Sequence, residues 1–194
     1  MTLRELVLAR PRLAHVFARD AHDRYVEPAW CSRRLFEVEW FVGVAHDPAA
    51  GSGQIVRSAR LAGLKVTQAD IAPIRRTAHS IDFFADETER DNVISNPPYG
   101  RLREFAEHAL AHTRKRVALL VPLARLNAAG AWLRSTPLRR VWLLTPRPSI
   151  PPHSVILAGE KPQGGRVDFC WLVWEQGFAG APELRWLHRD GTTP

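Results

Sequence analysis

This sequence has few cysteines, few lysines and no long apolar run. The shortage of cysteines and the missing apolar run each exclude a class of protein. The 194 residues include two cysteines, Cys31 and Cys170. Two are too few for a disulfide framework or a dedicated zinc site, and both lie in apolar-rich surroundings, so we expect buried thiols and no metal. No stretch approaches the ~20 consecutive apolar residues that span a bilayer, so we expect no membrane partner.

The beginning of the chain and several missing motifs narrow the function further. The first residues include Arg4, Arg10 and Arg12 and lack the apolar region of a secretory signal peptide, so we expect a cytoplasmic protein. No glycine loop ends in Gly-Lys-Ser/Thr, which argues against a nucleoside triphosphate, and no Gly-x-Ser-x-Gly elbow indicates an acyl hydrolase. His108 and His112 are four residues apart, but without a neighbouring carboxylate motif this spacing indicates a solvent-exposed helix face.

The charge balance favours an anionic partner without identifying it. The formal charge of +7 and the pI near 10.4 are typical of proteins that bind nucleic acid. Only three of the 27 basic residues are lysines, and such an arginine-rich composition is also typical of GC-rich genomes. The basic runs 114–116 and 139–140 could contact phosphates or could be ordinary surface charges.

The pattern of apolar residues predicts a single α/β domain over 1–194. With 45% hydrophobic residues the chain is long enough for one buried core and too short for two. Strands are predicted at 41–45, 64–69, 91–95, 117–123, 141–144, 169–174 and 184–187, and helices at 3–19, 29–39, 54–62 and 102–112. Alternating strands and helices imply a parallel sheet, and the last strands suggest an antiparallel pair. A proline-rich irregular loop is expected over 145–165, near the active face.

A glycine-containing loop follows the first predicted strand. Residues 47–53 read Asp-Pro-Ala-Ala-Gly-Ser-Gly. Gly51 and Gly53 permit a tight turn and a close approach of the backbone to a ligand. Asp47 lies at the carboxyl end of the strand, where open α/β sheets bind their ligands, and its charge could hold an ammonium or hydroxyl group. Asp70 ends the second strand, where it could receive ribose hydroxyls or could be a solvated turn residue.

A second motif, Asn96-Pro97-Pro98-Tyr99-Gly100, directly follows the strand predicted at 91–95. The two prolines supply no backbone donors, so the Asn96 side chain and the Pro97 carbonyl are free to act as acceptors. Two acceptors suit one NH2 group, and the Tyr99 ring could lie flat on a heterocycle. The motif therefore predicts a binding site for a planar amine.

These two motifs, in this order, make residues 25–174 resemble the S-adenosylmethionine-dependent DNA adenine-N6 methyltransferases, in particular their compact phage and prophage type. The resemblance implies a Rossmann-like class I methyltransferase fold, a mostly parallel sheet with a late antiparallel strand, and helices on both faces. It also implies that the N-terminal helical segment 1–40 packs on the cofactor side, and that 145–165 helps to hold the target base. That loop has no aromatic residue, so His153 or Arg147 would have to substitute.

The resemblance assigns two sets of residues. The implied cofactor-binding residues are Tyr25, Pro28, Asp47, Pro48, Ala49, Gly51, Gly53, Asp70, Ile71, Asp82, Phe83 and Asn96. The implied target-amine residues are Asn96, Pro97, Pro98 and Tyr99. Asp82 would contact the cofactor adenine and Phe83 would stack on it, although Phe83 and Phe84 could equally be core residues.

The expected reaction is transfer of a methyl group from the sulfonium of S-adenosylmethionine to the N6 amine of adenine in DNA, with weak or short sequence specificity. Accepting both amine hydrogens would stabilise the positive charge that develops on nitrogen. Three alternatives remain open at this stage: methylation of an RNA base, methylation of a protein glutamine, and a non-catalytic relative that binds nucleic acid.

Overall fold

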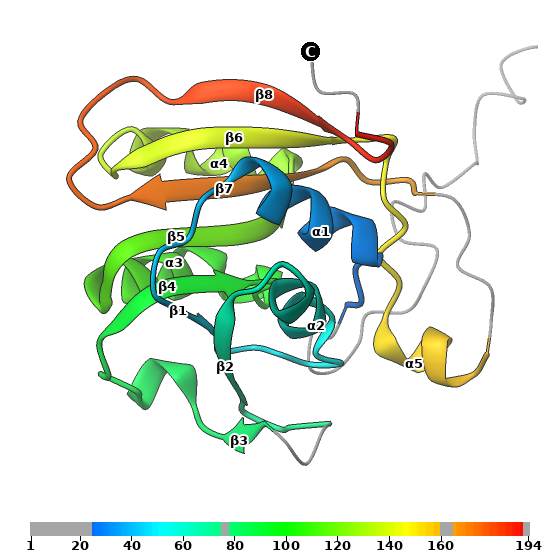
Figure 1. Cartoon of the computed structure of the whole chain (residues 1–194). Coiled ribbons are helices and arrows are strands. Elements are labelled where there is room, and N and C mark those ends of the chain that lie inside the picture. Colours follow the sequence, from blue (N-terminus) through cyan, green and yellow to red (C-terminus); the bar gives the residue numbers. More distant parts are fainter. Residues whose placement is uncertain (1–24, 75–77, 160–164, 192–194) are drawn as a thin grey trace, which may run out of the picture.

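Eight strands form one sheet in the order β3-β2-β1-β4-β5-β7-β6-β8 (Figure 1). The computed structural model describes residues 25–74, 78–159 and 165–191. The strands are β1 (Val44–Asp47), β2 (Lys65–Asp70), β3 (His79–Ser80), β4 (Arg90–Ser95), β5 (Thr113–Pro122), β6 (Leu138–Thr145), β7 (Phe169–Glu175) and β8 (Glu183–His188). Only β7 is antiparallel to its neighbours, β5 and β6, and β8 is an edge strand parallel to β6. The predicted mostly parallel sheet with a late antiparallel strand is confirmed.

Helices cover both faces of this sheet. They are α1 (Ala29–Val38), α2 (Gln54–Leu61), α3 (Leu102–Ala111) and α4 (Ala124–Leu133). The short α5 (His153–Leu157) lies to one side of the sheet (Figure 1), and the 3-10 turns are η1 (Phe83–Ala85) and η2 (Tyr99–Arg101). The first pair, α1 and α2, lies on one face, and α3 and α4 lie on the other (Figure 1). The described residues include no helix long and apolar enough to cross a bilayer.

The central strand β5 shows why the sheet is buried on both sides. Its alternate residues Ala118 and Leu120 join the apolar cluster beneath α1 and α2, whereas Val117, Leu119 and Val121 join the cluster beneath α3 and α4. A strand that is covered on both faces reads as a continuous apolar run, which is the pattern that predicted it. The two cysteines are buried, one in each cluster, as expected.

Several boundaries differ from the sequence predictions for identifiable reasons. β1 begins at Val44 rather than at residue 41, because Gly43 has φ of 97° and interrupts the extended run. The helix α4 was not predicted, since Asn127 and Gly130 weaken its helical pattern. The 145–165 segment is not wholly irregular, because α5 begins directly after Pro152. The predicted helix 3–19 lies outside the described residues.

Candidate active site

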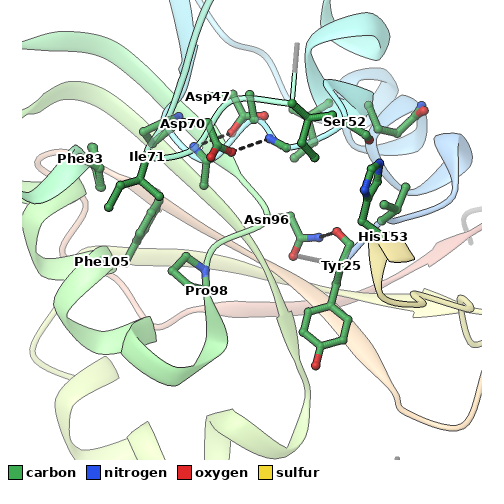
Figure 2. Close-up of a pocket in the computed structure, with 18 of the residues that line it drawn as sticks. Tyr25, Asp47, Ser52, Asp70, Ile71, Phe83, Asn96, Pro98, Phe105 and His153 are labelled. Carbon is green, nitrogen blue, oxygen red and sulfur yellow. Dashed lines mark hydrogen bonds between the residues drawn. The ribbon is translucent and has the colours of Figure 1, made fainter. Parts of the chain in front are cut away.

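A pocket lies at the carboxyl ends of β1, β2 and β4 (Figure 2). The strand order reverses between β1 and β4, because β2 and β3 extend to one side of β1 and β4 lies on the other. Open α/β sheets bind ligands at such a switch point. Of the residues predicted from sequence, the pocket lining contains Tyr25, Asp47, Pro48, Ala49, Gly51, Asp70, Ile71, Asp82, Phe83, Asn96 and Pro98. Pro28, Gly53, Pro97 and Tyr99 are outside that lining.

The glycine loop is shaped by two residues with positive φ. Gly51 has φ of 47°, and Gly53, with φ of 72°, is the residue from which α2 begins. The Gly51 backbone N–H donates a hydrogen bond of 2.8 Å to Asp70 Oδ2, and the Ala50 N–H donates one of 3.0 Å to the Ala69 carbonyl. Asp70 thus connects the end of β2 to the loop that follows β1.

Asp70 is well placed to accept further hydrogen bonds from a ligand. Its other oxygen, Oδ1, accepts from the Ala72 N–H at 2.9 Å, and 7% of the residue is exposed, on the pocket. A carboxylate oxygen accepts more than one hydrogen bond. The side chain can therefore hold the loop and still bind a ligand hydroxyl pair.

Asp47 is buried and carries an unusual pKa. Its Oδ1 accepts a hydrogen bond of 2.8 Å from the Ser95 hydroxyl and one of 3.3 Å from the Ala49 N–H. Burial raises the pKa of Asp47 from 3.8 to about 8, and the neighbouring carboxyl groups of Glu27 and Asp70 raise it as well. The carboxyl group is thus largely protonated at neutral pH, and a bound cation would favour its ionised form.

An apolar slot forms the end of the pocket around Ile71, Phe83 and Phe105 (Figure 2). Ile71 is 65% exposed. The Phe83 ring packs against two other rings, with its centroid 4.5 Å from that of Phe105 and 4.7 Å from that of His108. Phe83 is therefore both a core residue and a pocket residue. Asp82 accepts a 3.0 Å hydrogen bond from the Phe84 N–H and so begins the turn η1.

Asn96 lies at the pocket with its amide fixed by three contacts. Its Nδ2 donates to the Tyr25 carbonyl at 3.0 Å and to Glu27 Oε2 at 3.1 Å, and its Oδ1 accepts from the Tyr99 hydroxyl at 2.6 Å. Glu27 was not predicted from the sequence, although it lies between the predicted residues Tyr25 and Pro28. A single glutamate just before a helix forms no recognisable sequence motif, so no sequence signal pointed to it.

Tyr99 is outside the pocket lining but contacts two residues that line it, Tyr25 and Asn96. Its ring stacks on the Tyr25 ring with centroids 5.7 Å apart and planes 19° apart, and it also contacts Phe169. One face of the Tyr99 ring is therefore already covered, and stacking on a heterocycle at that face would require Tyr25 to move. The pKa of Tyr99 is raised by burial.

The 145–165 segment contributes to the pocket through α5. The Val26 N–H donates to the Pro151 carbonyl at 2.9 Å, which holds residues 25–26 against this segment. His153 lines the pocket, whereas Arg147 is paired with Asp168 and lies outside the lining. Of the two residues considered as substitutes for an aromatic side chain, only His153 is at the site.

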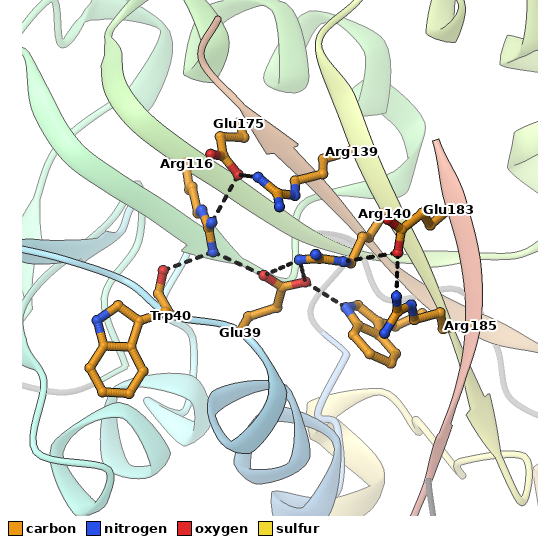
Figure 3. A network of polar contacts seen from close by, with 9 residues as sticks. Glu39, Trp40, Arg116, Arg139, Arg140, Glu175, Glu183 and Arg185 are labelled. Atoms are coloured by element: carbon orange, nitrogen blue, oxygen red, sulfur yellow. Dashed lines mark hydrogen bonds and ion pairs between the residues drawn. The ribbon is translucent and has the colours of Figure 1, made fainter. Parts of the chain in front are cut away.

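Three arginines of the basic runs, Arg116, Arg139 and Arg140, form ion pairs away from the pocket (Figure 3). Buried Glu39 accepts hydrogen bonds of 3.0 Å from both Arg116 and Arg140, and of 2.8 Å from the Trp142 indole. Glu175 accepts from Arg116 and Arg139. These arginines lie in the first half of β5 and β6, at the end of the sheet opposite the carboxyl-end pocket.

The two histidines of α3 are not on a solvent-exposed face. His108 and His112 are half-buried, their ring centroids are 4.5 Å apart, and His108 contacts Phe83. His108 packs on Phe83 because the pocket wall lies beneath this part of α3, which the spacing alone did not reveal. Within the described part of the chain, no group of three or more potential metal ligands is present.

No protein-family model and no curated protein matches this chain, whereas solved structures do. The M protein of the type I restriction enzyme EcoKI aligns with a TM-score of 0.58 and 14% identity over 85% of this chain and 48% of its own. A modification subunit from Vibrio vulnificus, of a provisionally assigned type I restriction enzyme, aligns with a TM-score of 0.54 and 13% identity. The alignment covers 95% of this chain and 49% of the subunit. A protein of Pyrococcus horikoshii, provisionally named an RNA methyltransferase, aligns with a TM-score of 0.54 and 18% identity. The alignment covers 76% of this chain and 81% of the Pyrococcus protein.

These likenesses concern the fold. The chain spans about half the length of the two restriction-enzyme subunits and most of the length of the Pyrococcus protein. The described sheet, with its reversal between β1 and β4 and its antiparallel β7, is the Rossmann-like fold of the methyltransferases.

Proposed function

We propose that this chain is an S-adenosylmethionine-dependent methyltransferase that acts on the N6 amine of adenine in DNA. The observation that carries the proposal is that the Asn96–Tyr99 motif follows β4 directly beside the glycine loop that follows β1, so that Asn96 and Gly51 line one pocket. A methyl donor and a planar amine must meet in one place, and this arrangement provides such a place.

The chemistry of the pocket residues fits the cofactor. Asp70 offers carboxylate oxygens for the ribose hydroxyls, and Ile71 and Phe83 offer an apolar slot for the adenine. Asp47 is a carboxyl group whose ionised form a nearby sulfonium or ammonium would favour. When bound, S-adenosylmethionine supplies an electrophilic methyl group.

The protein's own contribution is position and charge stabilisation. The Asn96 oxygen and the Pro97 carbonyl accept hydrogen bonds from the two hydrogens of the target amine. Those bonds strengthen as positive charge develops on the nitrogen, so they stabilise the transition state more than the ground state. Since the adenine amine is held beside the methyl donor, positioning replaces the need for a strong base. A base in a duplex must first leave the stack to reach Asn96.

Weak or short sequence specificity is part of the proposal. Between residues 25 and 191 the described elements belong to the sheet and its covering helices, and 145–165 is the longest connection. The segment contributes His153 to the pocket, so readout of flanking bases would come from this connection. The net charge of +7 agrees with a nucleic-acid substrate.

An RNA base is the second candidate acceptor, because the Pyrococcus structure with the same fold bears that name. A protein glutamine and a binding function without turnover are the remaining alternatives. All four use the same pocket and differ in what reaches Asn96.

Methyl transfer from labelled S-adenosylmethionine to unmethylated DNA, total RNA and a release factor, assayed in parallel, tests the proposal. Nucleoside and peptide mass spectrometry then identifies the product. Labelled N6-methyladenine in DNA is expected with the wild type and with Asn127→Ala, an exposed control on α4, and not with Asn96→Ala. If label appears only in RNA or in protein, the acceptor is that molecule and not DNA. If the cofactor binds and no methyl group is transferred, the non-catalytic alternative is correct.

A further inference from the structure

Glu27 is a buried carboxyl group in direct contact with Asn96. It is 5% exposed, lines the pocket, and accepts a 3.1 Å hydrogen bond from Asn96 Nδ2. No strand or helix requires an acid at this position, since Glu27 precedes the extended N-cap residue of α1, Pro28. A carboxylate that is almost removed from water costs stability unless it has a specific partner.

The contacts around the Asn96 amide determine which way it faces. A carboxylate oxygen and a backbone carbonyl can only accept hydrogen bonds, so the Glu27 and Tyr25 oxygens require the amide nitrogen on their side. The amide oxygen is then directed to the opposite side, where it accepts from the Tyr99 hydroxyl and keeps a second lone pair for another donor. Figure 2 shows the nitrogen of Asn96 turned toward the Tyr25 carbonyl oxygen.

The Tyr99 hydroxyl alone cannot fix this orientation. A hydroxyl both donates and accepts, so it could hydrogen-bond to either end of the amide. The Tyr25 carbonyl and Glu27 are therefore the groups that discriminate between the two orientations. Of these, only Glu27 acts through a side chain that substitution can remove.

We propose that Glu27 is a positioning residue that orients the Asn96 amide, holding its oxygen available to the target amine. The proposal rests on the function proposed above, in which Asn96 accepts from that amine. In the reversed orientation the NH2 group of Asn96 would face the NH2 group of the base, two donors would meet, and the amine could not be held.

The ionisation of Glu27 is coupled to its surroundings. Burial raises the pKa of Glu27 to about 7, while the hydrogen bond from Asn96 and the charge of Arg57 lower it. The titratable and charged groups near it are Cys31 on α1, Asp47 at the end of β1, Arg57 on α2, Tyr99 after β4 and His153 on α5. The ionised form accepts only, whereas the protonated form can also donate, so deprotonation strengthens the preference for the amide nitrogen on this side.

Two substitutions separate positioning from packing. Glu27→Ala removes the acceptor, and Glu27→Gln retains an amide oxygen that can accept from Asn96 Nδ2. We expect Glu27→Ala to lower kcat about 10- to 100-fold, the loss that is typical when a group that orients a metal ligand is removed. S-adenosylmethionine affinity should stay within about threefold, and Glu27→Gln should recover most of kcat. Glu87→Ala, on an exposed loop, is the matched control.

A spectroscopic measurement on the free protein needs no acceptor. The side-chain amide resonances of Asn96 should shift with a midpoint near pH 7 in the wild type, following Glu27, and should lose this midpoint in Glu27→Gln. If the shift is present and no acceptor is methylated, the proposed function is wrong while the Glu27–Asn96 contact is retained. Wild-type kcat in Glu27→Ala, or an Asn96 amide that is insensitive to Glu27→Gln, would overturn the positioning role.

Discussion

The Ser95 hydroxyl donates a 2.8 Å hydrogen bond to the Asp47 carboxyl group, joining residues that are 48 positions apart in the sequence. Asp47 ends β1 and Ser95 ends β4, and these two strands are parallel neighbours. The loop expected to bind the cofactor and the loop expected to bind the amine therefore begin from the same point of the sheet. Their proximity follows from strand order rather than from any local feature of either motif.

Asp47 should make the stability of the free protein fall as pH rises. Its pKa is raised from 3.8 to about 8 in the folded state, so between these values the folded protein holds a proton that the unfolded chain has lost. The Asp47→Asn variant lacks this titration. The difference in unfolding free energy, variant minus wild type, should therefore increase from pH 4 to pH 8 in urea titrations.

A difference that is constant with pH would show that Asp47 ionises normally in the folded protein. Asn127→Ala, on the exposed face of α4, changes no titratable group and provides the matched control.

Asn96→Ala should lower methyl transfer by roughly 10²–10³-fold, the loss seen when one group that stabilises transition-state charge is removed. Binding of S-adenosylmethionine should change by only a few-fold, because Ile71, Asp70 and the glycine loop are unaltered. Initial rates at saturating cofactor, together with equilibrium binding, measure the two effects separately. An active Asn96→Ala enzyme is incompatible with the proposed mechanism.

Asp70→Asn should weaken S-adenosylmethionine binding by roughly 10- to 100-fold, because hydrogen bonds to a charged group contribute about 1.5–3 kcal/mol. The amide keeps the side-chain volume but presents one acceptor oxygen instead of two. Calorimetric titration measures the affinity. Equal affinities for the wild type and Asp70→Asn would remove Asp70 from the cofactor site.

Glu39→Gln should destabilise the fold without affecting the pocket. Glu39 is buried beneath Arg116, Arg140 and Trp142, and removing one partner from a buried ion pair typically costs about 3–5 kcal/mol. Thermal unfolding measures the loss. The exposed pair of Glu107 with Arg103 supplies a control, since Glu107→Gln should cost no more than about 0.5 kcal/mol. A stability loss no larger than that control would assign Glu39 a minor role.

Much of the fold could be predicted because its signals are local. The continuous apolar run at 117–123 indicated a strand covered on both faces, and β5 has that environment. The helix predicted at 54–62 is α2, which begins at Gln54 after the left-handed Gly53. Asp70 lies at the pocket because the carboxyl ends of parallel strands meet at one edge of a sheet.

Other features depend on contacts that a sequence pattern does not contain. Glu27 is a pocket residue only because Asn96, 69 positions away, folds against it. The inward position of Tyr99 depends on stacking with Tyr25, and the aromatic identity of Tyr99 fits an inward or an outward ring equally well. Arg116, Arg139 and Arg140 were recognisable as basic, but their partners Glu39 and Glu175 come from distant segments.

The central claim is that the pocket between the two motifs binds S-adenosylmethionine. The most direct test measures this binding in a variant that carries a side chain at Gly51 of the glycine loop. Gly51 lines the pocket with φ of 47°. Gly63 has φ of 81° outside the pocket lining, and a Cβ there would meet no heavy atom of the described residues within 4 Å. Valine is strained at both positions, so Gly63→Val controls for strain alone. We predict one-to-one binding of S-adenosylmethionine by the wild type and by Gly63→Val, and its loss in Gly51→Val. No binding by the wild type, or equal binding by all three proteins, would contradict the account.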